Sequence, residues 1–229
     1  MKECDILGFV DLSEETRKNE KFLGQFANKD LFFDYEILDP GYILGYSKFG
    51  DLENPWTEKL KGKKVLVISS HANTILEQWK NIDKIWGEDR DKIVPFELVG
   101  CIKTPFHPAI DDRQYDNCNS FEDLVEITKS KIDEYDYDVL LTGVTTQSPF
   151  YAQHAKNRGK VGIQTGGVIQ LFFGILGERW VINYNTYYPR EDKKMFNENW
   201  IYPLSEDEPQ AKSQIGFLET SYEIGRAHV

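Results

Sequence analysis

The chain has 229 residues, of which 40% are hydrophobic and 14% are aromatic, and this composition excludes an intrinsically disordered protein. Its formal net charge of -11 argues against nucleic acid and anionic membranes as partners, because both prefer basic surfaces. The sequence has no apolar run of the ~18 residues that a membrane span needs, no signal-peptide core and no C-x-x-C pair. We therefore expect a cytoplasmic protein with free thiols.

The first 60 residues show no regular alternation of strands and helices. Ser13 precedes a run with acidic residues in its first turn, which predicts a helix with Ser13 as its N-cap. Aromatic residues and turn formers follow, among them Asp39-Pro40-Gly41. This part of the sequence predicts irregular structure with short strands.

A regular alternation begins at residue 61. The β-branched run 65–68 predicts a strand that is buried on both faces. Apolar residues at helical spacing over 71–86 predict a helix after it. Residues 93–103 predict a second strand, which should begin after Pro95 because proline cannot donate to a sheet ladder.

The alternation continues through two further strands. Ser120 opens a capping box and predicts a helix start, and residues 138–143 predict the third strand. A helix over 148–158 should end at Gly159, before a fourth strand at 161–163 and a helix after Gly167. Four successive strand–helix units indicate an α/β, Rossmann-like fold with a mainly parallel sheet flanked by helices.

The domain organisation follows from this alternation. We expect a single α/β domain over 1–229, with an N-terminal segment (1–60), a Rossmann-like core (61–180) and a C-terminal extension (181–229) that wraps back across the sheet edge. The chain could also be one domain of a longer protein.

Small or polar residues follow each predicted strand, at the end where open α/β sheets bind ligands. Gly166 and Gly167 lack a Cβ, so their backbone N–H groups could approach a diphosphate or a sugar beside a helix N-terminus. The alternative is a tight turn that simply requires glycine. The candidate substrate-binding residues at these ends are Ser69, Ser70, Gly143, Thr145, Thr146, Gln147, Gln164, Thr165, Gly166, Gly167 and Gln170.

Other residues are candidates for catalysis or further binding. His71 follows a strand directly and could act as a base or a phosphate contact, or lie in solvent at a helix start. Asp11 could be a general base if the N-terminal segment covers the site, or an ordinary surface carboxylate. Arg179 could clamp a phosphate, Trp180 could stack on a ring, and Asn199 belongs to a second polar–aromatic pair.

Known nucleotide and metal motifs are mostly missing. The sequence contains neither the G-x-G-x-x-G dinucleotide fingerprint nor a P-loop, which argues against a dehydrogenase or an ATPase. Asp51-Leu52-Glu53 is a D-x-E pattern that could hold a divalent metal through carboxylate oxygens. A three-residue match of this kind is weak.

Several segments together resemble a group of proteins from bacterial polysaccharide loci and large viruses that is associated with glycan assembly. The segments are "PWTEKLKGKKVLVIS", "YDYDVLLTGV", "YAQHAKNRGK", "TGGVIQLFFGILGERW" and "NENWIYPL". The layout of this group is similar to that of GT-D-type glycosyltransferases, which pair a nucleotide-binding α/β sheet with an acidic metal motif. The group's G-C-G-A-Y-G reads here as the more polar Gly143-Val-Thr-Thr-Gln-Ser148.

The resemblance implies a glycosyltransferase that moves a sugar, for example the deoxysugar rhamnose, from a UDP-, GDP- or TDP-linked donor onto a surface or capsid glycan. It implies a divalent metal, Mn or Mg, with Asp51 and Glu53 as candidate ligands, and a cytoplasmic location (the host cytosol for a viral protein). Two alternatives stay open. One is an S-adenosylmethionine-dependent or pyruvyl transferase acting on glycans, and the other is a non-catalytic nucleotide- or glycan-binding domain.

Overall fold

The computed structural model describes residues 6–8, 36–38, 56–104, 118, 120–177 and 196–207. The chain divides into two compact units, Met1–Trp56 and Thr57–Val229. In the first unit, β1 (Ile6–Gly8) and β2 (Glu36–Leu38) pair in parallel. The N-terminal segment therefore contains short strands, as expected, whereas the helix predicted after Ser13 lies outside the described residues. The single-domain organisation stays a prediction.

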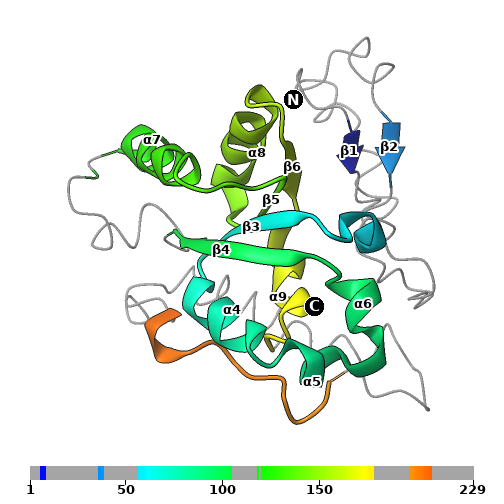
Figure 1. Ribbon diagram of the computed structural model, residues 1–229. Coiled ribbons are helices and arrows are strands. Elements are labelled where there is room, and N and C mark those ends of the chain that lie inside the picture. The colour runs from blue at the N-terminus through cyan, green and yellow to red at the C-terminus, as the bar shows by residue number, and fades with distance from the viewer. Residues whose placement is uncertain are drawn as a thin grey trace, which may run out of the picture. The chain divides into compact units, whose positions relative to one another are not determined.

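The second unit is built on a parallel sheet of β3 (Lys64–Ser69), β4 (Glu97–Lys103), β5 (Val139–Thr142) and β6 (Val161–Gln164). The strand order is β4-β3-β5-β6, with helices on both faces (Figure 1). This arrangement confirms the α/β, Rossmann-like fold. After β4 has been placed on one side of β3, the chain crosses to the other side to form β5, so the winding direction reverses between β3 and β5.

One face of the sheet is covered by α7 (Phe121–Ile132) and α8 (Ser148–Asn157) (Figure 1). The start of α7 and the end of α8 are set by neighbouring residues, as predicted. The Ser120 hydroxyl accepts a hydrogen bond from Asp123 N at 3.0 Å, and Gly159 follows α8 with a φ of 72°. The apolar core beneath them is formed by Leu66, Ile68, Ile102, Val125, Ile132, Tyr137, Leu140, Val144, Tyr151 and Ala155.

The opposite face carries shorter helices. They are α4 (Ala72–Trp79), α5 (Ile82–Trp86), α6 (Arg90–Ile93) and α9 (Ile169–Phe172). The prediction of a single helix over 71–86 is wrong. The chain forms two helices with a break at Asn81, where the backbone makes hydrogen bonds of the 3-10 type, from residue i to residue i−3. The helix after Gly167 is also shorter than its apolar run indicates. No helix in the described ranges has the length and apolarity to cross a membrane.

Single turns of 3-10 helix connect several of these elements. They are η2 (Trp56–Leu60), η3 (Gly87–Asp89), η5 (Thr145–Gln147), η6 (Gly166–Val168) and η7 (Ser205–Asp207). Two of them, η5 and η6, directly follow the ends of β5 and β6. The predicted glycine-rich junctions therefore fold as tight turns at the carboxyl edge of the sheet.

The described part of the C-terminal extension, which we call the 196–207 segment, returns to α4 and α5 (orange in Figure 1). Ile201 forms a parallel bridge with Ile175, which follows α9. Asn197 donates to the carbonyl of Ile85 at 3.0 Å and thereby caps the end of α5. Trp200 is buried against Trp86, with 5.5 Å between ring centroids. The expected return of the chain is thus built from a cap and an aromatic contact.

Candidate functional site

The carboxyl ends of the four strands lie in register at one edge of the sheet. Ser69 pairs with Lys103, Ile68 with Thr142, and Thr142 with Gln164. Ligands of open α/β sheets bind beyond these ends, at the point where the winding direction reverses. In this chain that point lies between β3 and β5, so the candidate site lies beyond Ser69 and Thr142.

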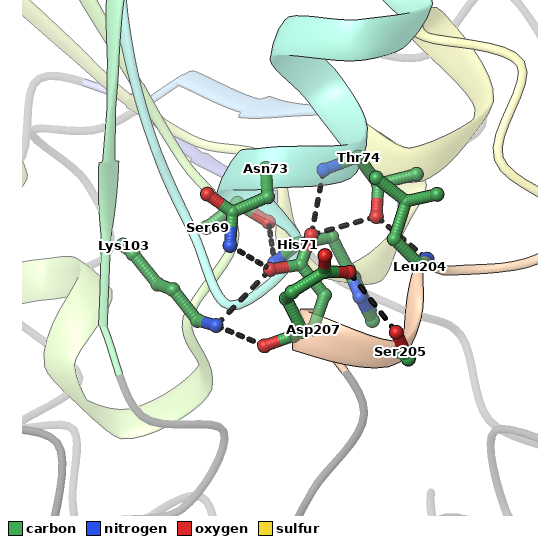
Figure 2. Close-up of polar contacts among 9 residues, drawn as sticks. Ser69, His71, Asn73, Thr74, Lys103, Leu204, Ser205 and Asp207 are labelled. Atoms are coloured by element: carbon green, nitrogen blue, oxygen red, sulfur yellow. Dashed lines mark hydrogen bonds and ion pairs between the residues drawn. The ribbon is translucent and has the colours of Figure 1, made fainter.

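A buried carboxylate, that of Asp207 in η7, lies beside the end of β3 (Figure 2). Its side chain is 0% exposed. Oδ2 accepts from the backbone N and the Oγ1 of Thr74, each at 2.6 Å, and Oδ1 accepts from Asn73 Nδ2 at 2.9 Å. The ammonium of Lys103 lies 3.1 Å from Oδ1. We call these donors of Thr74, Asn73 and Lys103 the anion cradle.

Asp207 supplies the N-terminal cap that α4 lacks in its own sequence. His71 occupies the N-cap position, but its side chain makes no capping hydrogen bond. The Asp207 carboxylate accepts the Thr74 N–H instead, and its negative charge suits the positive end of the helix dipole. Thr74 Oγ1 also accepts from Leu204 N at 3.0 Å, so one threonine makes three hydrogen bonds to the 196–207 segment.

His71 is buried next to this carboxylate, with 6% of its surface exposed. Burial lowers the pKa of His71 to about 4, the nearby Asp207 opposes that shift, and Lys103 adds to it. The ring is therefore neutral at neutral pH. Its Nε2 lies 2.6 Å from the side-chain nitrogen of Gln170 in α9, whereas Nδ1 has no hydrogen-bond partner among the described residues.

The tautomer of His71 follows from this contact. When the Gln170 amide donates to Nε2, the single ring proton must be carried by Nδ1. The buried Nδ1–H is then left without an acceptor, which costs roughly 1–3 kcal/mol in a protein interior. An unpaired donor at a strand end is an unusual feature, and it is the kind of group that a ligand acceptor would satisfy.

Several of the predicted binding residues use their side chains inside the protein. Ser69 Oγ accepts from His71 N at 3.1 Å, and Thr165 Oγ1 donates to the Thr142 carbonyl at 3.2 Å. Gln147 is fully buried and accepts from Tyr151 at 2.8 Å. Ser70 is buried as well. These contacts give a structural reason for polar residues at the strand ends, and their part in ligand binding stays a prediction.

The predicted binding glycines have different surroundings. A Cβ on Gly143 would lie 2.5 Å from Ile169 Cγ2 and 2.7 Å from the Gly166 carbonyl oxygen, so close packing alone requires glycine there. Gly166 has a φ of 59°, which favours glycine in the turn. Gly167, Thr146 and Gln164 are exposed, whereas Gly143, Gly166 and Gln170 are half-buried.

The predicted residue Asn199 does not join this cluster. Asn199 donates to the Lys84 carbonyl at 3.4 Å and to Asn197 Oδ1 at 3.2 Å, which helps to cap α5. The side chain of Thr145 and the residues Asp11, Asp51, Glu53, Arg179 and Trp180 lie outside the described part of the structure. Across the residues that are described, no group of three or more His, Cys, Asp and Glu side chains is placed to hold a metal ion.

The sequence predictions missed Asp207, Lys103, Asn73 and Thr74. The stretch 205–208 looks like an ordinary solvated acidic turn, and no local pattern distinguishes Asp207 from its neighbours. Its hydrogen-bond partner Thr74 lies 133 residues earlier in the chain. The sequence does contain one sign that a distant acceptor is needed, which is the absence of a capping residue at the start of α4. A helix without Ser, Thr, Asp or Asn at its N-cap needs an acceptor from elsewhere in the chain.

The chemistry available here is that of a buried anion site beside a neutral histidine, at the winding reversal of a parallel sheet. Any function has to be inferred from these residues. Comparisons of the chain with models of known families, with curated proteins and with solved structures found no match.

Proposed function

We propose that the chain is a glycosyltransferase that binds a nucleotide-sugar donor beyond the carboxyl ends of β3 and β5. The observation that supports this proposal is the position of the anion cradle. Its donors come from α4, which follows β3, and from Lys103 at the end of β4. Sheets of this topology bind the diphosphate of a nucleotide near a helix N-terminus at the same place.

Exposed residues at the carboxyl ends of β5 and β6 supply the remaining contacts in this proposal. Thr146 lies in the turn after β5, Gln164 is the last residue of β6, and both are exposed. Gly167 is exposed as well, so its backbone can approach a phosphate or a sugar hydroxyl. The resemblance to GT-D-type enzymes favours a UDP-, GDP- or TDP-linked donor and a glycan acceptor.

The proposed general base is His71, whose Nε2 would exchange the Gln170 amide for the acceptor hydroxyl and then take its proton. A base must be unprotonated, and the lowered pKa of about 4 keeps this ring neutral at pH 7. A pKa that low also makes a weak base, so His71 would gain basicity when solvent or substrate reaches it. Asp11 is the alternative base, and Asp51 and Glu53 are the proposed ligands for Mn or Mg.

The first experiment is a thermal-shift screen with UDP, GDP, TDP and S-adenosylmethionine, each with and without Mn or Mg. A ligand that binds only the folded state raises the melting temperature. The second is a panel of nucleotide sugars in which the released nucleotide is measured, with and without glycan acceptors. Absence of nucleotide binding and of turnover in both experiments would sink the proposal.

Variants of two histidines give a matched comparison for the turnover assay. His71→Gln should lower turnover by about 100-fold, the usual contribution of a general base. His154→Gln should leave turnover unchanged, because His154 contacts Asp133, which follows α7, at 2.8 Å, on the face of the sheet opposite α4. Equal turnover of the two variants would remove His71 from the mechanism.

A non-catalytic nucleotide- or glycan-binding domain is a second candidate function, because His71 is buried and has almost no access to an acceptor. Nucleotide binding without turnover would favour it. A methyltransferase has less support, since its ribose would need an acid at the end of the second strand, where β4 ends in Lys103. Stabilisation by S-adenosylmethionine alone would revive that alternative.

A further inference from the structure

The anion cradle is already filled by a group of the protein itself. A backbone N–H, a hydroxyl, a side-chain amide and an ammonium converge on the Asp207 carboxylate. Figure 2 shows these donors around the carboxylate, with η7 below them. This set of donors is the one that phosphate groups use in proteins, where helix N–H groups and lysine combine.

The cradle contains more than a helix cap requires. A helix cap needs one acceptor for one N–H. Here Lys103, at the end of β4, also contacts the carboxylate and adds a full positive charge. His71 lies close enough for both Asp207 and Lys103 to affect its titration, and its buried Nδ1 lacks a partner within the described structure. A ligand with several acceptor oxygens could satisfy this donor, which the single carboxylate leaves unpaired.

We infer that the Asp207 carboxylate occupies a phosphate site, and that a diphosphate-bearing ligand displaces it and releases the 196–207 segment. This inference rests on the proposed function, since it names the place of the donor's diphosphate and the conformational step that admits it. Release of η7 also removes the cover from the start of α4, where His71 is buried. Donor binding and access to His71 are then one event.

The charges favour displacement by a diphosphate over displacement by a simple anion. A tethered carboxylate acts as a competitor at an effective concentration on the order of millimolar or higher, so a free carboxylate cannot replace it. The diphosphate brings a second negative charge to Lys103 and to the end of α4, and the rest of the ligand adds contacts of its own. The 196–207 segment is then the gate of the site.

The wild-type protein provides the first test, by amide hydrogen exchange. Leu204 N and Thr74 N are a matched pair, because both are held by this contact but only Leu204 moves away with the segment. Inorganic diphosphate, added until its effect saturates, should speed exchange at Leu204 by about tenfold or more and leave Thr74 protected. Sodium chloride at equal ionic strength should change neither amide. Unchanged exchange at Leu204 in saturating diphosphate overturns the inference.

Removal of the internal competitor provides the second test. In Asp207→Asn an amide replaces the carboxylate, so inorganic diphosphate should bind about tenfold more tightly than to the wild type. Lys103→Gln in that background should reverse the gain. The matched control is Asp136→Asn, which removes an exposed carboxylate paired with Lys64 and should leave the affinity unchanged. Equal affinities of Asp207→Asn and the wild type contradict the inference.

The two proposals fail in different ways. Tighter binding of diphosphate to Asp207→Asn together with no turnover of any nucleotide sugar would support the phosphate site and reject the transferase. Turnover of a nucleotide sugar with no release of Leu204 would support the transferase and reject the displacement. If Asp207→Asn proves unfolded by near-ultraviolet circular dichroism, the exchange experiment on the wild type decides alone.

Discussion

The two faces of the sheet are stabilised in different ways. On the face of α7 and α8, the capping signals lie next to the helices in the sequence, with Ser120 at the start of α7 and Gly159 after the end of α8. On the face of α4 and α5, the stabilising groups come from far along the chain. Asp207 caps α4, and Asn197 caps the end of α5. The candidate site lies on the second face, where long-range contacts determine which groups meet.

This difference explains which parts of the molecule the sequence could predict. The run 65–68, the cap at Ser120 and the stop at Gly159 depend on neighbouring residues, and the structure confirms the elements predicted from them. By contrast, the helix expected over 71–86 breaks at Asn81. The apolar spacing gave no warning, because Ile75, Ile82 and Ile85 stay on the buried side across the break.

The comparison predicts that loss of a long-range cap destabilises the protein more than any local change. Asp207→Ala should lower the free energy of unfolding by about 4 kcal/mol, because it leaves the Thr74 N–H without its acceptor and removes the buried carboxylate that pairs with the Lys103 ammonium. Urea unfolding at pH 7 measures this change. Asp136→Asn, at an exposed ion pair, is the control and should have no measurable effect. Similar midpoints for both variants would remove the distinction between the faces.

Acid should also act mainly on the second face, through His71. The folded-state pKa of about 4 lies below the usual 6.5, so between these values the unfolded chain binds a proton that the folded protein excludes. Stability contributed by the neutral ring is therefore complete above pH 7 and falls as the pH is lowered toward 4, by about 3 kcal/mol in total. Unfolding free energies of the wild type and of His71→Gln, measured across this range, should differ in slope. Parallel curves would show that His71 titrates normally.

On the face of α7 and α8, stability should depend on close packing between helix and sheet rather than on caps from distant residues. A Cβ on Gly162 in β6 would lie 2.6 Å from Ala152 Cα in α8, and backbone cannot move aside as a side chain can. Gly162→Ala should therefore cost about 2 kcal/mol. Thermal unfolding measures this loss. Diphosphate binding at the other face should be retained, and its disappearance would mean that the two faces are coupled.

A local cap should give the smallest change. Ser120→Ala removes the hydroxyl that accepts from Asp123 N and should cost about 1 kcal/mol, the usual value for an N-cap. Urea unfolding again provides the measurement. Ser120→Asp, which keeps an acceptor at the same position, should restore most of the loss. A cost equal to that of Asp207→Ala would contradict the ranking of local and distant caps.

Parts of the candidate site were accessible to sequence reasoning and parts were not. His71 and Gln170 were both predicted from their places after strands, and the structure brings them within 2.6 Å of each other. The cradle was not predicted, because its carboxylate and its donors are joined only by tertiary folding. Asn199 was predicted as a ligand contact, whereas its side chain bonds to Lys84 and Asn197 at the end of α5.

The separation of 133 residues between Thr74 and Asp207 has a consequence for folding during synthesis on the ribosome. At 5–20 residues per second, the acid is made on the order of ten seconds after the helix that it caps. During that interval α4 leaves the exit tunnel with its first N–H groups exposed to water, whereas the cap of α7 at Ser120 and the stop of α8 at Gly159 are made together with their helices. The nascent chain should therefore complete the α7 and α8 side first and close the α4 side only after Asp207 has been made.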